Sequence, residues 1–241
     1  MTRSSRCKSE PVFPGILQEF KDRCLTVMAK QNLIIIGAGK FGREVYTWAG
    51  QTIEKSAPWT IKGFLDDRPD ALRGLNYPHG VISTVAAYAP KAADVFLCAM
   101  GDPVLKKKYC EQVLQKGGVF TTLIHPTALI GPNVKIGAGS IICPFTQISC
   151  EVELGRCVTF GTFSATAHDT IIGDWCQISG HCGINGNAVL EEGAFLGSHA
   201  VILPGVRVGA WAYVGAGSIV LKRVRPGVKV FGNPAVPMEK A

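Results

Sequence analysis

Long apolar runs and paired cysteines are missing from this 241-residue sequence. No run approaches the roughly 18 apolar residues that mark a membrane-spanning helix, and the N-terminus lacks the apolar segment of a signal peptide. The nine cysteines include no CxxC pair, and the spacing of Cys143, Cys150 and Cys157 matches no common zinc site. We therefore expect a cytoplasmic protein without a membrane span, whose reduced thiols pack as small apolar side chains.

Most of the chain also lacks an excess of charge of either sign. The net charge is +7, but residues 1–31 carry six Lys/Arg against three Asp/Glu and residues 219–241 carry five against one. Residues 32–218 are therefore neutral overall. A basic surface for nucleic acid would have to lie at one end of the chain, and we expect no nucleic-acid partner. With 47% hydrophobic and 18% charged residues, the composition excludes wholesale disorder.

From Leu33 onward, apolar strands alternate with helices. We expect strands at residues 33–36, 59–65, 94–100 and 119–124, and helices at about 43–52 and 104–115. This order predicts a parallel α/β sheet. Because the segment has under 100 residues, it makes about half of a full dinucleotide-binding fold.

A glycine-rich turn, formed by Gly37, Gly39 and Gly42, joins the first predicted strand to the first predicted helix. Such glycines permit a tight turn, and the helix N-terminus behind them favours a phosphate group. The turn would equally suit NAD, with Asp66 or Asp67 on the ribose, but the short sheet argues against a complete NAD-binding fold.

A strict repeat of six residues fills the second half of the chain. Of the sixteen positions taken every sixth residue from Ile130 to Val220, fifteen are apolar, and Thr166 is the exception. The residue two before each of them is small or β-branched. A helix cannot keep this period on one face. The repeat therefore predicts a parallel β-helix of short strands, three to a coil, although the period does not set its handedness.

The repeat also predicts which side chains stack on neighbouring coils. His168 should lie one strand spacing, about 4.8 Å, from Gly186. An imidazole beside an accessible backbone N–H could deprotonate a nucleophile and stabilise an oxyanion. The alternative is that His168 only caps a corner of the coil. On another face Gly180, Ser198 and Ala216 form a column of small residues that would let a long ligand approach the backbone.

Several stretches of the chain resemble one family of enzymes. The repeat resembles the hexapeptide-repeat acyltransferases, and the chain from about residue 32 resembles the sugar O- and N-acetyltransferases. These include the bacillosamine-pathway UDP-4-amino-sugar N-acetyltransferases and the sialic acid O-acetyltransferases. The matching stretches are residues 35–42, 63–67, 124–126, 167–169 with 172–174, and 231–235.

The resemblance implies a left-handed β-helix, acetyl-CoA as the acyl donor, and a homotrimer with active sites between subunits. In this family the position of His168 is the catalytic base, and the position of Asp169 raises its basicity. The N–H at the position of Gly186 meets the thioester carbonyl. Ser198 and Ala216 fall on positions that contact the coenzyme.

Two positions depart from the pattern of the family. Gln177 stands where some members have a second His near the coenzyme, so this contact is weaker or differently donated. Phe41 replaces a His in the glycine turn, which suggests a different sugar or nucleotide. The predicted acceptor-binding residues are Gly39, Lys40, Phe41, Asp66 and Asp67.

These observations predict three parts: an N-terminal appendage (1–31), an α/β nucleotide-sugar-binding domain (32–125) and a left-handed β-helix domain (126–241). The predicted activity is acetyl transfer from acetyl-CoA to the amino group of a nucleotide-linked amino sugar, for surface glycan biosynthesis.

Two alternatives remain open. One is O-acetylation of a sialic acid-type sugar. The other is a non-catalytic or metal-binding β-helix, since carbonic anhydrases on this scaffold bind zinc through three histidines. His181 and His199 are expected to stack one coil apart, but their spacing supplies no third ligand, and we expect no metal.

Overall fold

The computed structural model describes residues 30–55 and 57–238, so the predicted appendage lies outside the described residues apart from its last two. Among the described residues, no helix is both long and apolar enough to cross a membrane. The α/β part consists of β1 (Gln31–Ile36), α2 (Lys40–Ile53), β2 (Trp59–Leu65), β3 (Val81–Ser83), β4 (Asp94–Cys98), α3 (Pro103–Gln115) and β5 (Val119–Phe120).

The α/β sheet is parallel, with the strand order β3-β2-β1-β4-β5. Residues 33–36 of the central strand β1 are fully buried. Leu33 and Ile35 pack in the same cluster as residues of α2, whereas Ile34 and Ile36 pack in the same cluster as residues of α3. Successive side chains of β1 thus point to opposite faces of the sheet, and one helix covers each face. Because β2 and β4 flank β1 on opposite sides, the topological switch point lies at the carboxyl ends of β1 and β4.

Two details of the α/β part differ from the sequence prediction. The short strand β3 was not predicted, and the expected strand at residues 119–124 is two strands in different sheets. β5 pairs with β4, whereas β6 (Leu123–Ile124) pairs with β9 (Ile141–Ile142) of the β-helix. Because both strands are apolar, the local sequence does not indicate that the chain passes from one sheet to the other between Phe120 and Leu123. The division of the chain at residue 125 stays a prediction.

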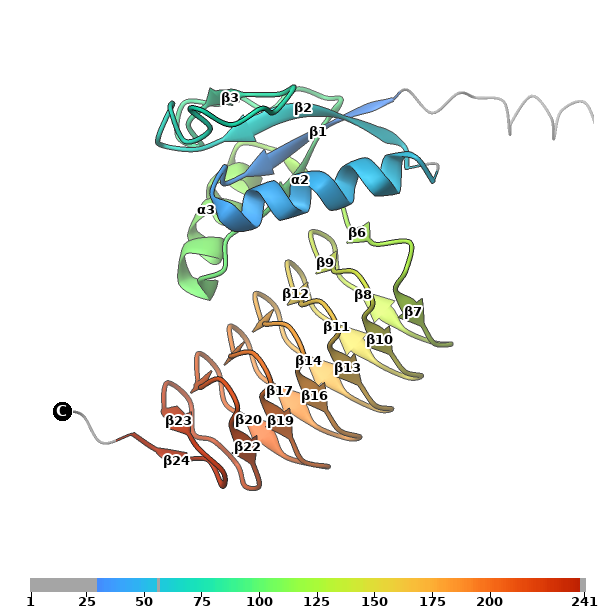
Figure 1. Ribbon diagram of the computed structural model, residues 1–241, viewed down its shortest axis with the longest axis vertical. Helices are drawn as coiled ribbons and strands as arrows, with labels where there is room; N and C mark the ends of the chain where they lie inside the picture. Colours follow the sequence, from blue (N-terminus) through green and yellow to red (C-terminus); the bar gives the residue numbers. More distant parts are fainter. Residues whose placement is uncertain (1–29, 56, 239–241) are drawn as a thin grey trace, which may run out of the picture. The chain divides into compact units, whose positions relative to one another are not determined.

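The predicted parallel β-helix is confirmed (Figure 1). Its three faces are three sheets. Face 1 contains β6, β9, β12 (Thr159–Phe160), β15 (Gln177–Ile178), β18 (Phe195–Leu196), β21 (Tyr213–Val214), β23 (Lys229–Phe231) and β24 (Val236–Pro237). Face 2 contains β7 (Leu129–Ile130), β10 (Gln147–Ile148), β13 (Ala165–Thr166), β16 (Gly183–Ile184), β19 (Val201–Ile202) and β22 (Ile219–Val220). Face 3 contains β8 (Lys135–Ile136), β11 (Glu153–Leu154), β14 (Ile171–Ile172), β17 (Val189–Leu190) and β20 (Arg207–Val208).

The register of these sheets is constant from coil to coil up to β22, whereas the last pairings, Tyr213 with Lys229 and Val208 with Val224, join residues sixteen apart. Gln147 pairs with Ala165, and Ala165 with Gly183, so each coil takes eighteen residues. The apolar residues of the repeat point inward and form one core along the β-helix. Thr166 also points inward and is 3% exposed, and its hydroxyl donates to the Ala167 carbonyl at 3.2 Å.

The corners of the coils use backbone in the left-handed region, even without glycine. Asp169 has a φ of 55° and Asn187 a φ of 60°. Their N–H groups donate one coil back, to the carbonyls of Cys150 at 3.3 Å and His168 at 3.0 Å. These bonds offset the cost of the left-handed conformation and fix the side chains that leave each corner.

The last strand of face 1 runs against the others. β24 is antiparallel to β23, whereas the other strands of this face pair in parallel. β24 is therefore the final edge strand of this eight-stranded sheet.

His125 joins the α/β part to the first coil. Its ring is buried, with Nε2 2.8 Å from Gln51 Oε1 in α2 and Nδ1 2.8 Å from Thr127 Oγ1. Nδ1 also accepts the Thr127 N–H at 3.2 Å, so the neutral ring donates from Nε2 to Gln51. Burial lowers the pKa of His125.

This junction predicts a pH dependence of stability. Because the folded pKa is lowered, the contribution of His125 is complete above its unfolded pKa of about 6.5 and is lost as pH falls below it. At pH 7.5 we expect His125→Gln to lower the free energy of unfolding by about 1–3 kcal/mol through lost hydrogen bonds. Urea unfolding at pH 7.5 and pH 5.5 should show a smaller gap between wild type and variant at pH 5.5. An equal gap at both pH values would contradict this role.

Candidate functional site

His168 lies at the corner between face 2 and face 3, in the turn that joins β13 to β14. Its Nδ1 is 2.7 Å from Asp169 Oδ2, and both side chains are more than half exposed. A neutral imidazole that donates from Nδ1 to the carboxylate keeps a lone pair on Nε2. The pair therefore presents a base to solvent, oriented by its neighbour in the sequence.

Gly186 lies directly against the His168 ring, as the repeat predicted. A methyl group at Gly186 would come within 2.9 Å of His168 Nε2 and 2.8 Å of Cε1, so a larger residue would displace the ring. Among the described residues, no backbone carbonyl accepts the Gly186 N–H. The corner thus combines a base with a free backbone donor, as proton abstraction and oxyanion stabilisation require.

The predicted column of small residues lies at a different corner. Gly180, Ser198 and Ala216 occupy the turns between face 1 and face 2, and Ser198 and Ala216 are exposed. One chain therefore does not bring this column together with His168 and Gly186, which lie at the corner between face 2 and face 3.

Beside that column runs a ladder of stacked rings. Ring centroids lie 5.0 Å apart between Phe145 and Phe163, 5.1 Å between Phe163 and His181, and 4.7 Å between His181 and His199. The expected stacking of the two histidines is confirmed. Among the described residues, no group of three His, Cys, Asp or Glu is placed to hold a metal ion.

Gln177 has a partner that the sequence did not indicate. It points outward from face 1 but is only 7% exposed, because its Oε1 accepts a hydrogen bond from Lys106 Nζ of α3 at 2.9 Å. Lys106 is 71 residues away in the chain, so no local motif could have revealed the pair. A coenzyme contact of Gln177 stays a prediction, and its side-chain oxygen is already bonded.

The glycine turn has the tight geometry that its sequence predicts. Gly37 has a φ of 95°, and a methyl group at Gly42 would lie 1.8 Å from the Gly37 carbonyl oxygen, so the turn requires both glycines. Gly39 is the N-cap of α2, with Lys40 exposed as the first helical residue. Phe41 packs partly on its own helix, with its ring centroid 6.1 Å from that of Trp48.

Asp66 builds this turn. Its Oδ2 accepts the Ala38 N–H at 2.8 Å, and both carboxylate oxygens accept hydrogen bonds from the Arg68 guanidinium at 3.0 and 3.1 Å. Burial raises the pKa of Asp66, but the bonds from Arg68 and Ala38 outweigh it and leave the pKa below its usual value. The carboxylate is occupied inside the protein, which argues against a ribose-binding role such as NAD would require.

Arg68 is the residue that sequence reasoning missed. Asp66 holds it in place, its side chain is 65% exposed, and its Nη2 lies 3.8 Å from the position of a methyl group on Gly39. A guanidinium beside a glycine turn is suited to bind a phosphate group. Asp67 is exposed and accepts a hydrogen bond from Tyr109 of α3 at 2.9 Å.

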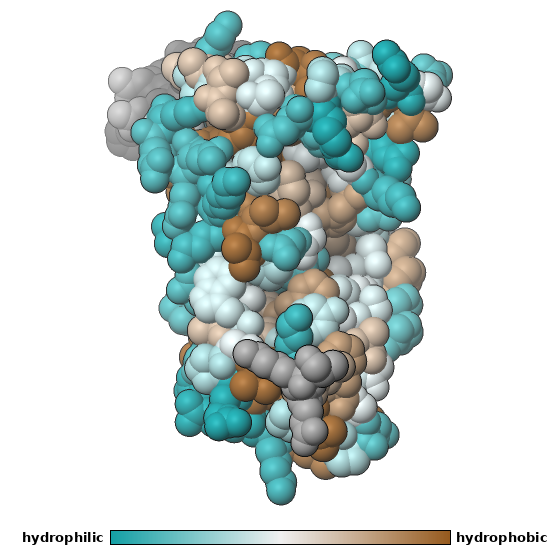
Figure 2. Space-filling view, turned by 90° about the vertical axis from the view of Figure 1, so that its left-hand side faces the viewer, coloured by the Kyte–Doolittle hydropathy of each residue, from teal (hydrophilic) through white to brown (hydrophobic). Residues whose placement is uncertain are grey.

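Two cavities open near the carboxyl ends of β2 and β4. The smaller, about 220 Å³, is lined by Leu65, Asp66, Asp67, Arg68, Val85, Met100, Leu105 and Tyr109. The larger, about 490 Å³, lies between the start of α3 and face 1 and is lined by Gly101, Asp102, Pro103, Val104, Gly193, Phe195, Trp211, Ala212, Tyr213 and Lys229. Figure 2 shows the side of the molecule on which α3 and β24 lie, where apolar patches interrupt a hydrophilic surface.

Both halves of the chain are similar to known protein families. The family "PglD N-terminal domain" matches residues 32–113, and "Bacterial transferase hexapeptide (six repeats)" matches residues 187–222. The chain is 32% identical over 212 residues to GDP-perosamine N-acetyltransferase from Escherichia coli O157:H7, covering 86% of this chain and 96% of that protein.

Solved structures show the same arrangement. The acetyltransferase domain of PglB from Neisseria gonorrhoeae FA1090 in complex with acetyl coenzyme A has a TM-score of 0.78 at 27% identity, covering 87% of this chain and 100% of that chain. PerB from Caulobacter crescentus, in complex with CoA and GDP-perosamine, has a TM-score of 0.78 at 25% identity, covering 86% and 97%.

The contacts of Asp66 predict its effect on stability. We expect Asp66→Ala to lower the free energy of unfolding by about 1–3 kcal/mol, because it leaves the buried Ala38 N–H without an acceptor. The matched variant Asp67→Ala removes an exposed carboxylate and should change stability by about 0.5 kcal/mol or less. Urea unfolding of both variants checks this, and equal effects would contradict a structural role specific to Asp66.

Proposed function

Since this chain belongs to the family of hexapeptide-repeat sugar acetyltransferases, we propose that it transfers the acetyl group of acetyl-CoA to the amino group of a nucleotide-linked amino sugar. The observation that carries the proposal is the corner where His168 Nε2 faces the Gly186 backbone, with Asp169 bonded to Nδ1. The name of the perosamine relative supports an amine rather than a hydroxyl as the acceptor.

The geometry supports direct transfer. As the sugar amine attacks the thioester carbonyl carbon, His168 Nε2 takes the proton that the amine loses. The Gly186 N–H donates to the oxygen on which negative charge develops. Asp169 stabilises the imidazolium that results. When the carbon–sulfur bond breaks, His168 returns the proton to the leaving thiolate, which leaves an N-acetyl sugar and free coenzyme A.

The acceptor nucleotide is proposed to bind at the switch point of the α/β sheet, where sheets of this kind bind ligands. Gly39 and Lys40 would contact its phosphates, with the Arg68 guanidinium beside them. Phe41, Asp66 and Asp67 complete the turn, Asp66 indirectly through its bonds to Ala38 and Arg68.

The donor is proposed to bind between subunits of a homotrimer. His168 and Gly186 lie at one corner of the coil, and Ser198 and Ala216 at another. A donor that contacts both pairs therefore needs a second copy, and a threefold axis would supply three equal sites. Gln177, the remaining proposed coenzyme contact, has its side-chain oxygen bonded to Lys106. We also propose that the enzyme works in the cytoplasm, where free thiols such as the seven described here persist.

The first test is turnover by purified protein. We expect acetyl-CoA-dependent acetylation of a UDP-, dTDP- or GDP-linked amino sugar, and none of free sialic acid. His168→Ala should lower kcat about 10²–10⁴-fold.

Gly186→Ala should also lower kcat, because its methyl group displaces the imidazole. Gly183→Ala is the matched control, since its methyl group would meet only Val201 Cγ2, at 3.9 Å. Turnover by His168→Ala at the wild-type rate would exclude the proposed mechanism.

A second test concerns Arg68. Arg68→Met should raise the KM for the nucleotide sugar about tenfold or more and leave the KM for acetyl-CoA unchanged, because it removes a charge-assisted contact worth about 1.5–3 kcal/mol. Arg68→Lys keeps the charge but loses the planar guanidinium, so its KM for the nucleotide sugar should lie between those of the wild type and Arg68→Met. Arg73→Met, at another exposed position, is the control. An unchanged KM in Arg68→Met would remove Arg68 from the acceptor site.

A further inference from the structure

Lys106 is fully buried where α3 packs against face 1. Its Nζ donates to Thr159 Oγ1 at 2.9 Å, to Gln177 Oε1 at 2.9 Å and to the Cys176 carbonyl at 3.2 Å. An ammonium group has three N–H donors, so these three acceptors satisfy all of them. None of the three is a carboxylate, and burial lowers the pKa of Lys106.

Face 1 carries a polar pair where this lysine arrives. The outward positions that pair from coil to coil form one column. In the order of the coils this column reads Leu123, Ile141, Thr159, Gln177, Phe195, Tyr213 and, at its end, Lys229. Apolar or aromatic side chains thus stand on both sides of one polar pair. The positions of Thr159 and Gln177 match the point at which Lys106 enters.

Stability alone does not explain a buried amine at this contact. Buried charged or polar groups are often replaced by apolar side chains of similar volume without loss of stability. Apolar contacts, however, are non-directional and let two surfaces slide, whereas hydrogen bonds fix distance and angle. The arrangement around Lys106 therefore specifies where α3 lies along face 1.

The placement of α3 matters because the helix forms walls of both cavities. Asp102, Pro103 and Val104 line the larger cavity together with residues of face 1. Leu105 and Tyr109, one turn apart on the same helix, line the smaller cavity, where Tyr109 bonds to Asp67. Any shift of α3 along face 1 would move these walls relative to the β-helix.

We propose that Lys106 is a positioning residue for the transfer reaction: with Thr159 and Gln177 it fixes α3 on face 1 and so sets the acceptor site relative to the β-helix that carries the acetyl group. The inference rests on the proposed function for its kinetic consequence, but the anchoring itself can be measured without turnover.

The kinetic test is Lys106→Met, which keeps an unbranched apolar chain in place of the lysine stem and removes the donors. We expect kcat/KM for the nucleotide amino sugar to fall about tenfold, while the KM for acetyl-CoA stays within about twofold. A purely structural role would lower the melting temperature or change both KM values alike. Wild-type kcat/KM for the acceptor, or an equal change in both KM values, would overturn the proposal.

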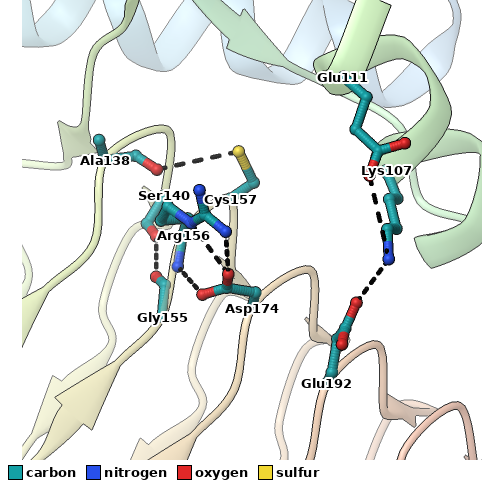
Figure 3. Close-up of polar contacts among 9 residues, drawn as sticks. All are labelled: Lys107, Glu111, Ala138, Ser140, Gly155, Arg156, Cys157, Asp174 and Glu192. Carbon is teal, nitrogen blue, oxygen red and sulfur yellow. Dashed lines mark hydrogen bonds and ion pairs between the residues drawn. The ribbon is translucent and has the colours of Figure 1, made fainter. Parts of the chain in front are cut away.

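The neighbouring lysine supplies a matched control. Lys107 also joins α3 to the β-helix, through Glu192 at 2.8 Å, and lies 4.0 Å from Glu111 on its own helix (Figure 3). Its side chain is 36% exposed, and exposed ion pairs contribute little. Lys107→Met should therefore leave the acceptor kinetics unchanged. A loss as large as that in Lys106→Met would show that any α3 contact suffices, and would overturn the specific role of Lys106.

Thr159 gives the conservative and the disruptive variant at one position. Thr159→Ser keeps the hydroxyl that accepts from Lys106 and should keep the wild-type kcat/KM for the nucleotide amino sugar. Thr159→Val removes this hydroxyl and should lower the same kcat/KM, as Lys106→Met does. The double variant Lys106→Met with Thr159→Val should be no worse than Lys106→Met alone, because both act through one contact. Additive losses would contradict the pairing.

Hydrogen exchange separates the anchoring from the proposed function. In Lys106→Met, the backbone amides of residues 101–109 should exchange about tenfold faster or more, and those of α2 at the wild-type rate. If the wild type acetylates no nucleotide amino sugar, the proposed function fails, and exchange still decides the anchoring. Unchanged exchange at residues 101–109 would overturn the anchoring even in an active enzyme.

Discussion

The structure depends on one constraint, the pairing of residues eighteen positions apart through all but the last coil of the β-helix. Because the register does not slip between these coils, side chains separated by eighteen residues become neighbours along a corner or a face. The contact between His168 and Gly186 follows from this rule, as do the ladder of rings at His181 and His199 and the polar pair at Thr159 and Gln177. The inward apolar residues maintain the register, and the register in turn brings the outward residues into contact with one another.

The same rule explains how much could be predicted from the sequence. A strict period of six residues has few structural solutions, so the β-helix, its core and the placement of His168 beside Gly186 followed from residue numbers alone. The glycine turn and its helix were also predictable, since Gly37 and Gly42 meet within one short segment. The handedness and the roles of Asp169, Ser198 and Ala216 came from resemblance to a family, because no local property of those residues specifies them.

The remaining features depend on contacts between distant segments. The sequence predicts that Asp66 binds the acceptor, and in the structure its carboxylate accepts hydrogen bonds from Arg68 and from the Ala38 N–H. No sequence motif indicates these internal partners. Lys106 lies in a predicted helix, but its partners belong to coils far along the chain. The split between β5 and β6 is of the same kind, because two apolar pieces of similar composition joined different sheets.

The reversed direction of β24 has a consequence for the behaviour of the protein at high concentration. A stack of parallel strands ends in unpaired N–H and C=O groups, a template on which a second molecule can add further strands. β24 pairs with that edge in the opposite sense, and Pro237 within it has no N–H to offer. At this end of face 1 the sheet therefore ends in an antiparallel strand with one N–H missing, which makes it a poorer template for strands of a second molecule.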